Sequence, residues 1–152
     1  MILACDGPGP RILGTRTLVR PEYLDLMGFT FPQGRQRILL SKDIRHIAAE
    51  MMGEMITEIL QTHGLVRADV RHWVLHSAGV RVLEQAQRHL GLTDADLAAP
   101  RAVLRRFGNM SSATVLFVLR EVLERRAPQP GDRGLMIALG PGFAAEGALL
   151  QW

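Results

Sequence analysis

The chain has 152 residues, 47% of them hydrophobic and 22% charged, a composition that fits one globular domain and excludes disordered and fibrous proteins. The net charge is +3 and the 18 basic residues are scattered without a basic tract, so we expect no nucleic-acid partner. No apolar run approaches the roughly 18 residues of a membrane span, no basic secretory n-region is present, and Cys5 is the sole cysteine, so we expect no membrane partner and a cytoplasmic protein without disulfides.

Residues 1–37 are rich in Gly, Pro and Arg, and only the stretch RILGTRTLV has the pattern of a strand. We therefore expect an irregular lead-in with one strand over residues 1–37. From Ser41 onward, apolar residues recur at helical spacing, which predicts a long amphipathic helix with Ser41 as its N-cap and Gly64 at its end. The methionines of this helix fall on its apolar face, which is typical of core packing.

A strand, a turn and several helices are expected next. Residues 73–75, Trp-Val-Leu, predict a short buried strand that ends at His76, and VRVLEQAQRHL predicts a helix that ends at Gly91. PRAVLRRF predicts a further turn or two of helix. The next helix is expected to begin at Ser111 or Ser112 and is strongly apolar.

The carboxy-terminal residues predict two strands, LMIAL and FAAEGALLQW, joined by the turn GPG at residues 140–142. Strands joined by a tight turn run antiparallel. Because strands and helices alternate in the rest of the chain, we expect an α/β fold with a mixed sheet layered between helices. Residues 1–152 are expected to form a single domain.

Among the histidines, His76 is the candidate for a functional role. His72 and His76 lie four residues apart, but on a strand this spacing spans roughly 13 Å, so the pair cannot share a metal ion and we expect no metal site. His76 stands where a buried strand meets a small-residue turn, a position from which α/β folds expose side chains to a crevice. It is either functional or a hydrogen-bonded structural histidine, and the other histidines are expected in water.

The only asparagine, Asn109, precedes a helix so apolar that we expect this part of the chain to be buried. A buried carboxamide without hydrogen-bond partners costs roughly 1–3 kcal/mol. The hydrogen-bond partners of the Asn109 carboxamide come either from the fold, with Asn109 as a helix cap that bonds the local backbone, or from a ligand. The helix itself must be covered on every side, and few elements remain in this chain to cover it.

Two other sequence features are weaker candidates. GPGFAA matches the G-x-G-x-x-A dinucleotide fingerprint and follows a strand, but a dinucleotide site needs a further helix, a strand and an acidic residue about 20 positions on. The segment is therefore a tight turn or a loop that walls a pocket. Cys5 has no neighbouring base or helix start to lower the pKa of its thiol, so we do not expect it to be a nucleophile.

The segments WVLHSAGVRVLEQ, FGNMSSATVLFVL and LGPGF, in this order and spacing, resemble the carboxy-terminal half of the chalcone and stilbene synthases, the type III polyketide synthases. The resemblance covers about three quarters of the chain. It implies a thiolase fold, in which two similar α/β halves stack, and a Cys-His-Asn triad that condenses coenzyme A thioester starters with malonyl-CoA. No cofactor beyond these thioester substrates is expected.

By this resemblance His76 and Asn109 are the catalytic histidine and asparagine, which would together stabilise the enolate of a decarboxylated malonyl thioester. Gly140, Pro141 and Gly142 match the loop that shapes the cyclisation pocket. Gly79 and Ser111 are expected to line the substrate pocket as well. In two places where the family usually carries glycine, this chain has Ala78 and Ala138, which puts the pocket width in doubt.

The family's nucleophilic cysteine belongs to its amino-terminal half, and Cys5 does not match its surroundings. We therefore expect a carboxy-terminal half-synthase that is incomplete alone and whose partner is an amino-terminal synthase half or a second copy of the chain. Two alternatives stay open. The chain could be half of a ketoacyl carrier-protein synthase, or a thiolase-like module kept for dimerisation or scaffolding without catalysis.

Overall fold

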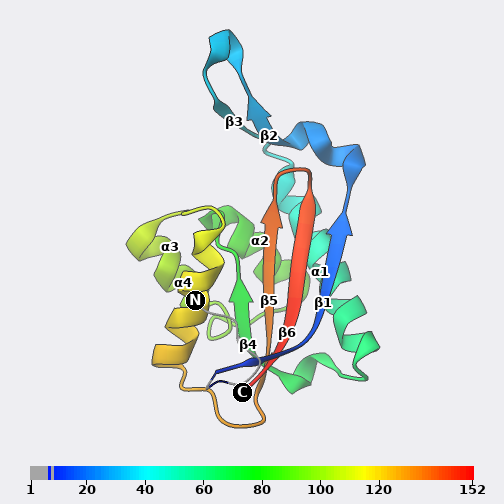
Figure 1. Ribbon diagram of the computed structural model, residues 1–152, viewed down its shortest axis with the longest axis vertical. Coiled ribbons are helices and arrows are strands. Elements are labelled where there is room, and N and C mark those ends of the chain that lie inside the picture. The colour runs from blue at the N-terminus through cyan, green and yellow to red at the C-terminus, as the bar shows by residue number, and fades with distance from the viewer. Residues whose placement is uncertain (1–6, 8) are drawn as a thin grey trace.

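The computed structural model describes residue 7 and residues 9–152, so Cys5 lies outside the described residues. Its main feature is a four-stranded sheet in the order β1-β6-β5-β4 (Figure 1). Its strands are β1 (Arg11–Val19), β4 (Val70–Leu75), β5 (Arg133–Gly140) and β6 (Ala144–Gln151). β6 runs antiparallel to both of its neighbours, whereas β4 and β5 are parallel. The expected mixed sheet is thus confirmed.

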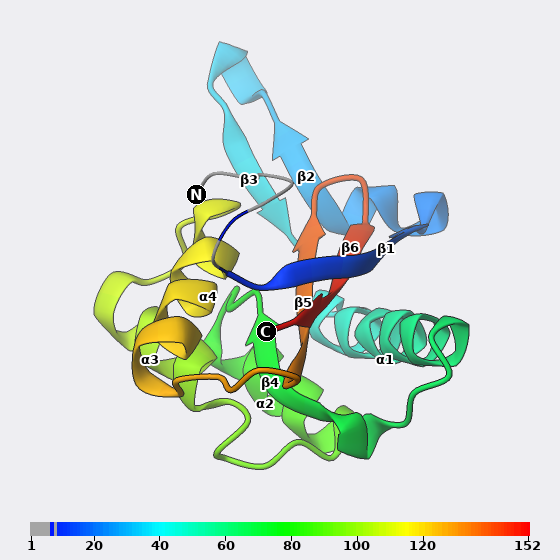
Figure 2. The ribbon, with the colours of Figure 1, turned by 60° about the horizontal axis from the view of Figure 1, so that its bottom comes forward.

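Helices cover both faces of this sheet (Figure 2). They are α1 (Ile44–Thr62), α2 (Val80–Leu90), α3 (Ala98–Phe107) and α4 (Ala113–Arg125). α1 and α2 pack together on one face, while α3 and α4 pack on β4 from the other. The side chains of β4 alternate accordingly, because Trp73 and Leu75 belong to the core under α1, and Val74 to the core under α4. None of the described helices combines the length and the apolar character that crossing a bilayer requires.

The lead-in holds more regular structure than expected. β1 confirms the strand in RILGTRTLV, but the following residues form a second sheet, the hairpin of β2 (Met27–Thr30) and β3 (Arg37–Leu40), instead of a loop. The hairpin closes through a turn in which Gln33 and Gly34 both have positive φ values, 54° and 74°. Its pairing register gathers the apolar side chains of Met27, Phe29, Ile38 and Leu40 on one face, but each strand is only four residues long, which is too short for this alternation to mark a strand in the sequence.

The start of α1 also differs in detail. The helix begins at Ile44 with Asp43 at the N-cap position, not Ser41. Ser41 still supports the turn before the helix, because its Oγ accepts a hydrogen bond from the Asp43 N–H at 3.3 Å. The helix ends at Thr62, two residues before the predicted break at Gly64, whose φ is +62°.

Two apolar surfaces lie open to solvent. The β2–β3 hairpin projects beyond the body of the molecule (Figure 1), with Phe31 64% and Ile38 76% exposed. On α4, Leu116 and Leu123 are exposed, so this helix is not covered on every side by the described residues. The hairpin gathers several exposed apolar side chains in one place, which is typical of a protein contact site; they are Phe29, Phe31, Ile38, Leu39 and Leu40.

The α1 layer lies so close to the sheet that it needs a glycine at position 147 of β6. A Cβ atom added to Gly147 would come within 2.6 Å of the Met55 Sδ and 2.7 Å of the Ile59 Cδ1. We predict that Gly147→Ala lowers the free energy of unfolding by about 1–3 kcal/mol through overpacking. Urea denaturation measures this. The control is Gly28→Ala, where the nearest atom to the added Cβ is 4.0 Å away; equal effects of the two substitutions would contradict the packing account.

Candidate active site

The histidine turn and the GPG turn leave the sheet at the same edge. β4 and β5 are parallel, so their carboxyl ends lie side by side, and the His76 N–H donates to the Ile137 carbonyl at 2.9 Å. β5 ends three residues later at Gly140, where the turn into β6 begins. In Figure 1 the arrowheads of β4 and β5 point toward the end of the sheet that carries this turn. Crevices at such carboxyl ends are common binding sites in α/β folds.

His76 is buried, with 8% of the residue exposed. Its Nδ1 makes no hydrogen bond with any residue that the structure describes, and the same is true of the Oγ of the neighbouring, fully buried Ser77. Burial lowers the pKa of the His76 imidazole, because desolvation disfavours the charged form. The neutral ring that results has one N–H donor and one acceptor nitrogen.

Asn109 lies in the loop between α3 and α4 and is tied to the histidine turn. Its Nδ2 donates to the carbonyl oxygen of Ala78 at 3.3 Å, and its Oδ1 accepts a hydrogen bond from the Ser111 N–H at 2.9 Å. The bond to Ala78 joins segments that are 31 residues apart, and the two bonds together set the orientation of the carboxamide. The bond from the Ser111 N–H also stabilises Ser111 itself, whose φ of +58° is unusual for a residue other than glycine.

The expectation that Asn109 is buried is wrong for this chain, because the residue is exposed. The loop ahead of α4 is open to solvent, whereas Thr114 and Val115 in the first turn of the helix are buried. Both hydrogen bonds of the Asn109 carboxamide are made within the fold, as in the structural alternative: Oδ1 bonds the local backbone at Ser111, while Nδ2 reaches the histidine turn at Ala78. The helix start itself is held by Thr114, whose Oγ1 accepts a hydrogen bond from the Met110 N–H at 2.8 Å, and the side chain of Ser112 makes no cap bond.

The glycines expected in the substrate pocket stand in open space. A Cβ atom added at Gly79, Gly140 or Gly142 would meet no atom within 4 Å. Gly142 has a φ of +83°, a conformation that favours glycine, and Pro141 beside it is exposed. Ser111 is also exposed and begins the turn into α4.

Phe143 anchors the GPG turn, and no pattern in the sequence indicates this role. Phe143 has a φ of +48°, which is strained for a non-glycine residue, and its side chain is completely buried. Its ring packs edge-on against Tyr23 with centroids 5.4 Å apart, and its carbonyl accepts a hydrogen bond from the Arg20 N–H at 3.0 Å. The GPG turn is therefore held by the lead-in, a long-range contact that no local pattern signals.

The expectation that His72 lies in water is wrong. It is buried on β4, and its Nε2 lies 3.0 Å from the Asp132 Oδ2. This contact and a hydrogen bond from the Gln129 N–H hold the pKa of the Asp132 carboxyl below its usual range, with the backbone bond as the larger cause. Among residue 7 and residues 9–152, no three His, Cys, Asp or Glu side chains gather in an arrangement that could hold a metal ion.

Comparison with known proteins adds to this geometry. The 1,3,6,8-tetrahydroxynaphthalene synthase of Streptomyces peucetius subsp. caesius is 36% identical over 143 residues, which is 94% of this chain and 38% of that protein. The β-ketoacyl-[acyl-carrier-protein] synthase III of Deinococcus deserti is 32% identical over 153 residues, which is 99% of this chain and 41% of that protein. The crystal structure of 1,3,6,8-tetrahydroxynaphthalene synthase from Streptomyces coelicolor A3(2) has a TM-score of 0.88 at 27% identity, covering 97% of this chain and 42% of that one.

The chain therefore spans about two fifths of the length of the curated relatives that it matches. The model of the carboxy-terminal domain of the chalcone and stilbene synthases matches residues 27–152, which is most of the chain. The fold matches as well, since the mixed sheet between helices is that of a thiolase-like carboxy-terminal half. The chain belongs to the chalcone and stilbene synthase family and corresponds to its carboxy-terminal domain.

Proposed function

We propose that this chain is the carboxy-terminal domain of a type III polyketide synthase, an acyltransferase that condenses coenzyme A thioester starters with malonyl-CoA. The hydrogen bond between Asn109 and Ala78 carries the proposal, because it brings the asparagine loop to the histidine turn. We further propose that residues 1–152 act as one domain, since β1 of the lead-in pairs with β6 along the length of both strands. Its thioester substrates are consistent with action in the cytoplasm.

The proposed chemistry needs two hydrogen-bond donors at one oxygen. When a malonyl thioester loses carbon dioxide, the electron pair of the broken C–C bond forms an enolate whose charge gathers on the thioester oxygen. An amide nitrogen carries two hydrogens, so Asn109 can donate one to this oxygen while Ala78 accepts the other. The neutral His76 ring supplies the second N–H. No resident cofactor is needed, because carbon dioxide leaves without its bonding electrons.

The enolate carbon then attacks the carbonyl carbon of an acyl group held as a thioester on a cysteine, and the cysteine thiolate leaves. We propose that this cysteine belongs to an amino-terminal synthase half, on this polypeptide or on another. Two observations support this: the relatives are more than twice as long as the matched region, and apolar surface on the hairpin and on α4 lies open. We also propose that two such synthases associate as a homodimer.

The two turns around the site are proposed to shape the pocket. Gly79 and the Gly140–Gly142 turn leave room for an acyl chain, because no atom lies where their side chains would be. Ser111 is proposed to line the same pocket beside Asn109. Ala138 is partly buried and packs against the core under α4, so we do not expect it to narrow the turn.

The test is a chimera in which this chain replaces the corresponding carboxy-terminal part of the Streptomyces peucetius synthase. We predict release of carbon dioxide from malonyl-CoA, and a fall of about 10²–10³ in its rate with Asn109→Ala, the usual cost of losing one oxyanion donor. His76→Gln should cause a loss of similar size. The matched control is Gln61→Ala, which removes an exposed carboxamide from the last turn of α1.

An active chimera whose rate is unchanged by Asn109→Ala and by His76→Gln would contradict the proposed mechanism and favour the scaffold alternative. Malonyl carrier protein is supplied in a parallel assay. Turnover of that substrate but not of malonyl-CoA would favour the ketoacyl carrier-protein synthase alternative.

The burial of His76 predicts a pH dependence of stability. Because burial lowers its folded-state pKa below the ordinary value of about 6.5, the unfolded chain binds more protons between these two values. The free energy of unfolding should therefore decrease as pH falls from about 7.5 through 6.5 toward 5. His76→Gln should make this decrease smaller, as measured by urea denaturation at each pH and constant protein concentration. Identical pH profiles for the two proteins would overturn the assignment.

The open apolar surfaces predict that the chain alone self-associates, which light scattering can measure. The substitutions Phe31→Ser and Ile38→Ser should reduce the association, because both side chains are mostly exposed. Their effect on the free energy of unfolding should stay within about 0.5 kcal/mol. A monodisperse, cooperatively unfolding monomer of the unmodified chain would count against a missing covering half.

A further inference from the structure

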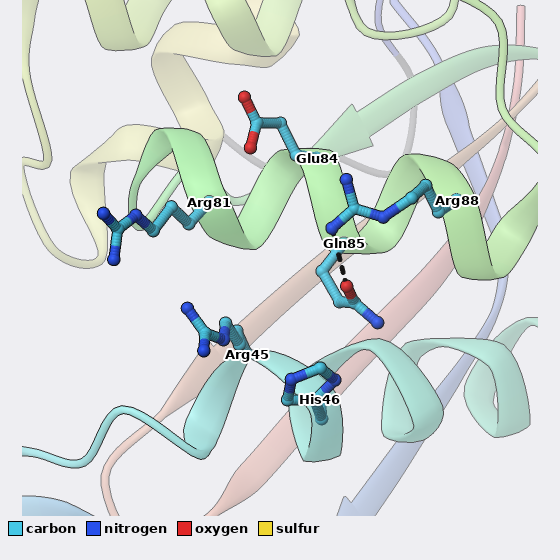
Figure 3. Close-up of a pocket in the computed structure, with 6 residues that line it drawn as sticks. All are labelled: Arg45, His46, Arg81, Glu84, Gln85 and Arg88. Carbon is cyan, nitrogen blue, oxygen red and sulfur yellow. Dashed lines mark hydrogen bonds between the residues drawn. The ribbon is translucent and has the colours of Figure 1, made fainter.

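A cleft of about 340 Å³ lies between the first turns of α1 and the length of α2 (Figure 3). It does not include His76 or Asn109. Three arginines and a histidine line it, with Glu84 as its single carboxylate; the lining residues are Arg45, His46, Arg81, Glu84, Gln85 and Arg88. In Figure 3 the carboxylate of Glu84 extends from the side of α2 that faces away from α1. The cleft is therefore strongly cationic.

The three arginines have no acidic partner among the described residues. Arg88 donates to the Oε1 of Gln85 at 2.8 Å, which is a neutral acceptor. Other exposed arginines of this chain, such as Arg16 and Arg120, pair with carboxylates. Three guanidinium groups that share the cleft with one carboxylate, to which none of them is paired, repel one another, and a bound anion relieves this repulsion.

The backbone adds to the positive potential. α1 and α2 are 19 and 11 residues long, and neither makes a side-chain hydrogen bond at its N-cap. No acidic residue stands in the first turn of either helix, while the N-cap of α1 is the acidic Asp43 and that of α2 is Gly79. Arg45 and Arg81 are each the second residue of their helix. The helix dipoles favour a negative charge at these starts, more at α2 than at α1, where the Asp43 carboxylate already supplies one.

The cleft also has a fixed relation to the proposed active site. α2 begins at Val80, four residues after His76, and Arg81 and Arg88 stand seven residues apart on it, which is about 10 Å along a helix. A long, flexible substrate whose thioester reaches His76 can therefore extend along α2 to the arginines. Guanidinium groups bind phosphate with paired, charge-assisted hydrogen bonds.

We propose that the Arg45, Arg81 and Arg88 cleft binds the phosphate of the pantetheine arm that carries the thioester substrate. This inference rests on the proposed function, because it assumes that a pantetheine thioester occupies the active site. The arm has the same phosphate in coenzyme A and in a carrier protein. The carboxy-terminal domain then holds both ends of the substrate arm, the thioester and the phosphate.

The experiment titrates the full chain with 4′-phosphopantetheine and with pantetheine, which differ only by the phosphate, in a calorimeter. The phosphorylated probe should bind more tightly. Arg81→Gln and Arg88→Gln should each weaken its binding by about tenfold, the scale of one charge-assisted hydrogen bond, and leave pantetheine binding unchanged. The matched control is Arg126→Gln, an exposed arginine at the end of α4, which should change neither.

Equal affinity for the two probes, no binding of either, or the same affinities in the Arg81→Gln and Arg126→Gln variants would overturn the proposal. Separate titrations with coenzyme A and with a phosphopantetheinylated carrier protein identify the source of the arm, and arginine-dependent binding of either one supports the cleft. The chimera separates the two proposals. If the chimera turns over malonyl-CoA and Arg81→Gln leaves its KM unchanged, the phosphate-binding proposal is refuted and the proposed function stands. If the chimera is inactive while the chain binds the phosphorylated probe more tightly than pantetheine, the proposed function is refuted and the phosphate-binding proposal stands.

Discussion

The hydrogen bond from the Asn109 carboxamide to the Ala78 carbonyl is the contact on which the candidate site depends. Asn109 follows α3, and Ala78 follows β4, so this bond joins two layers of the fold at one edge of the sheet. The parallel pairing of β4 and β5 determines where the edge lies, since it sets the histidine turn beside the turn at Gly140. Without either pairing, the two motifs would be separate loops with no shared chemistry.

Much of this arrangement could be predicted from the sequence, because periodicity and small-residue turns are local signals. The helices after Ser41 and after Gly79, the buried strand that ends at His76 and the antiparallel carboxy-terminal strands are all observed. The hairpin at residues 27–40 was missed because each of its strands is only four residues long, too short for a period-two pattern to stand out in the sequence. In the fold its apolar face carries the exposed side chains of Phe29, Ile38 and Leu40, which suits a surface that another protein covers.

The errors at the site have one physical cause, which is that burial depends on neighbours that are distant in the sequence. Asn109 was expected in the interior because the following helix is apolar, but burial begins inside the helix, at Thr114 and Val115, and the loop that holds Asn109 is exposed. His72 was expected in water, yet Asp132, 60 residues away, gives its ring a buried partner. The apolar pattern of α4 predicts a helix covered on every side, whereas Leu116 and Leu123 are exposed, and we propose that the amino-terminal half covers this side.

The central claim is that His76 and Asn109 donate to the same thioester oxygen. A crystal structure of the chimera with a malonyl-CoA analogue that cannot lose carbon dioxide tests this most directly. We predict that a ring nitrogen of His76 and the Nδ2 of Asn109 both lie within about 3.2 Å of that oxygen, with the Ala78 contact retained. A thioester oxygen held by other groups, with the Asn109 amide directed into solvent, would contradict the account.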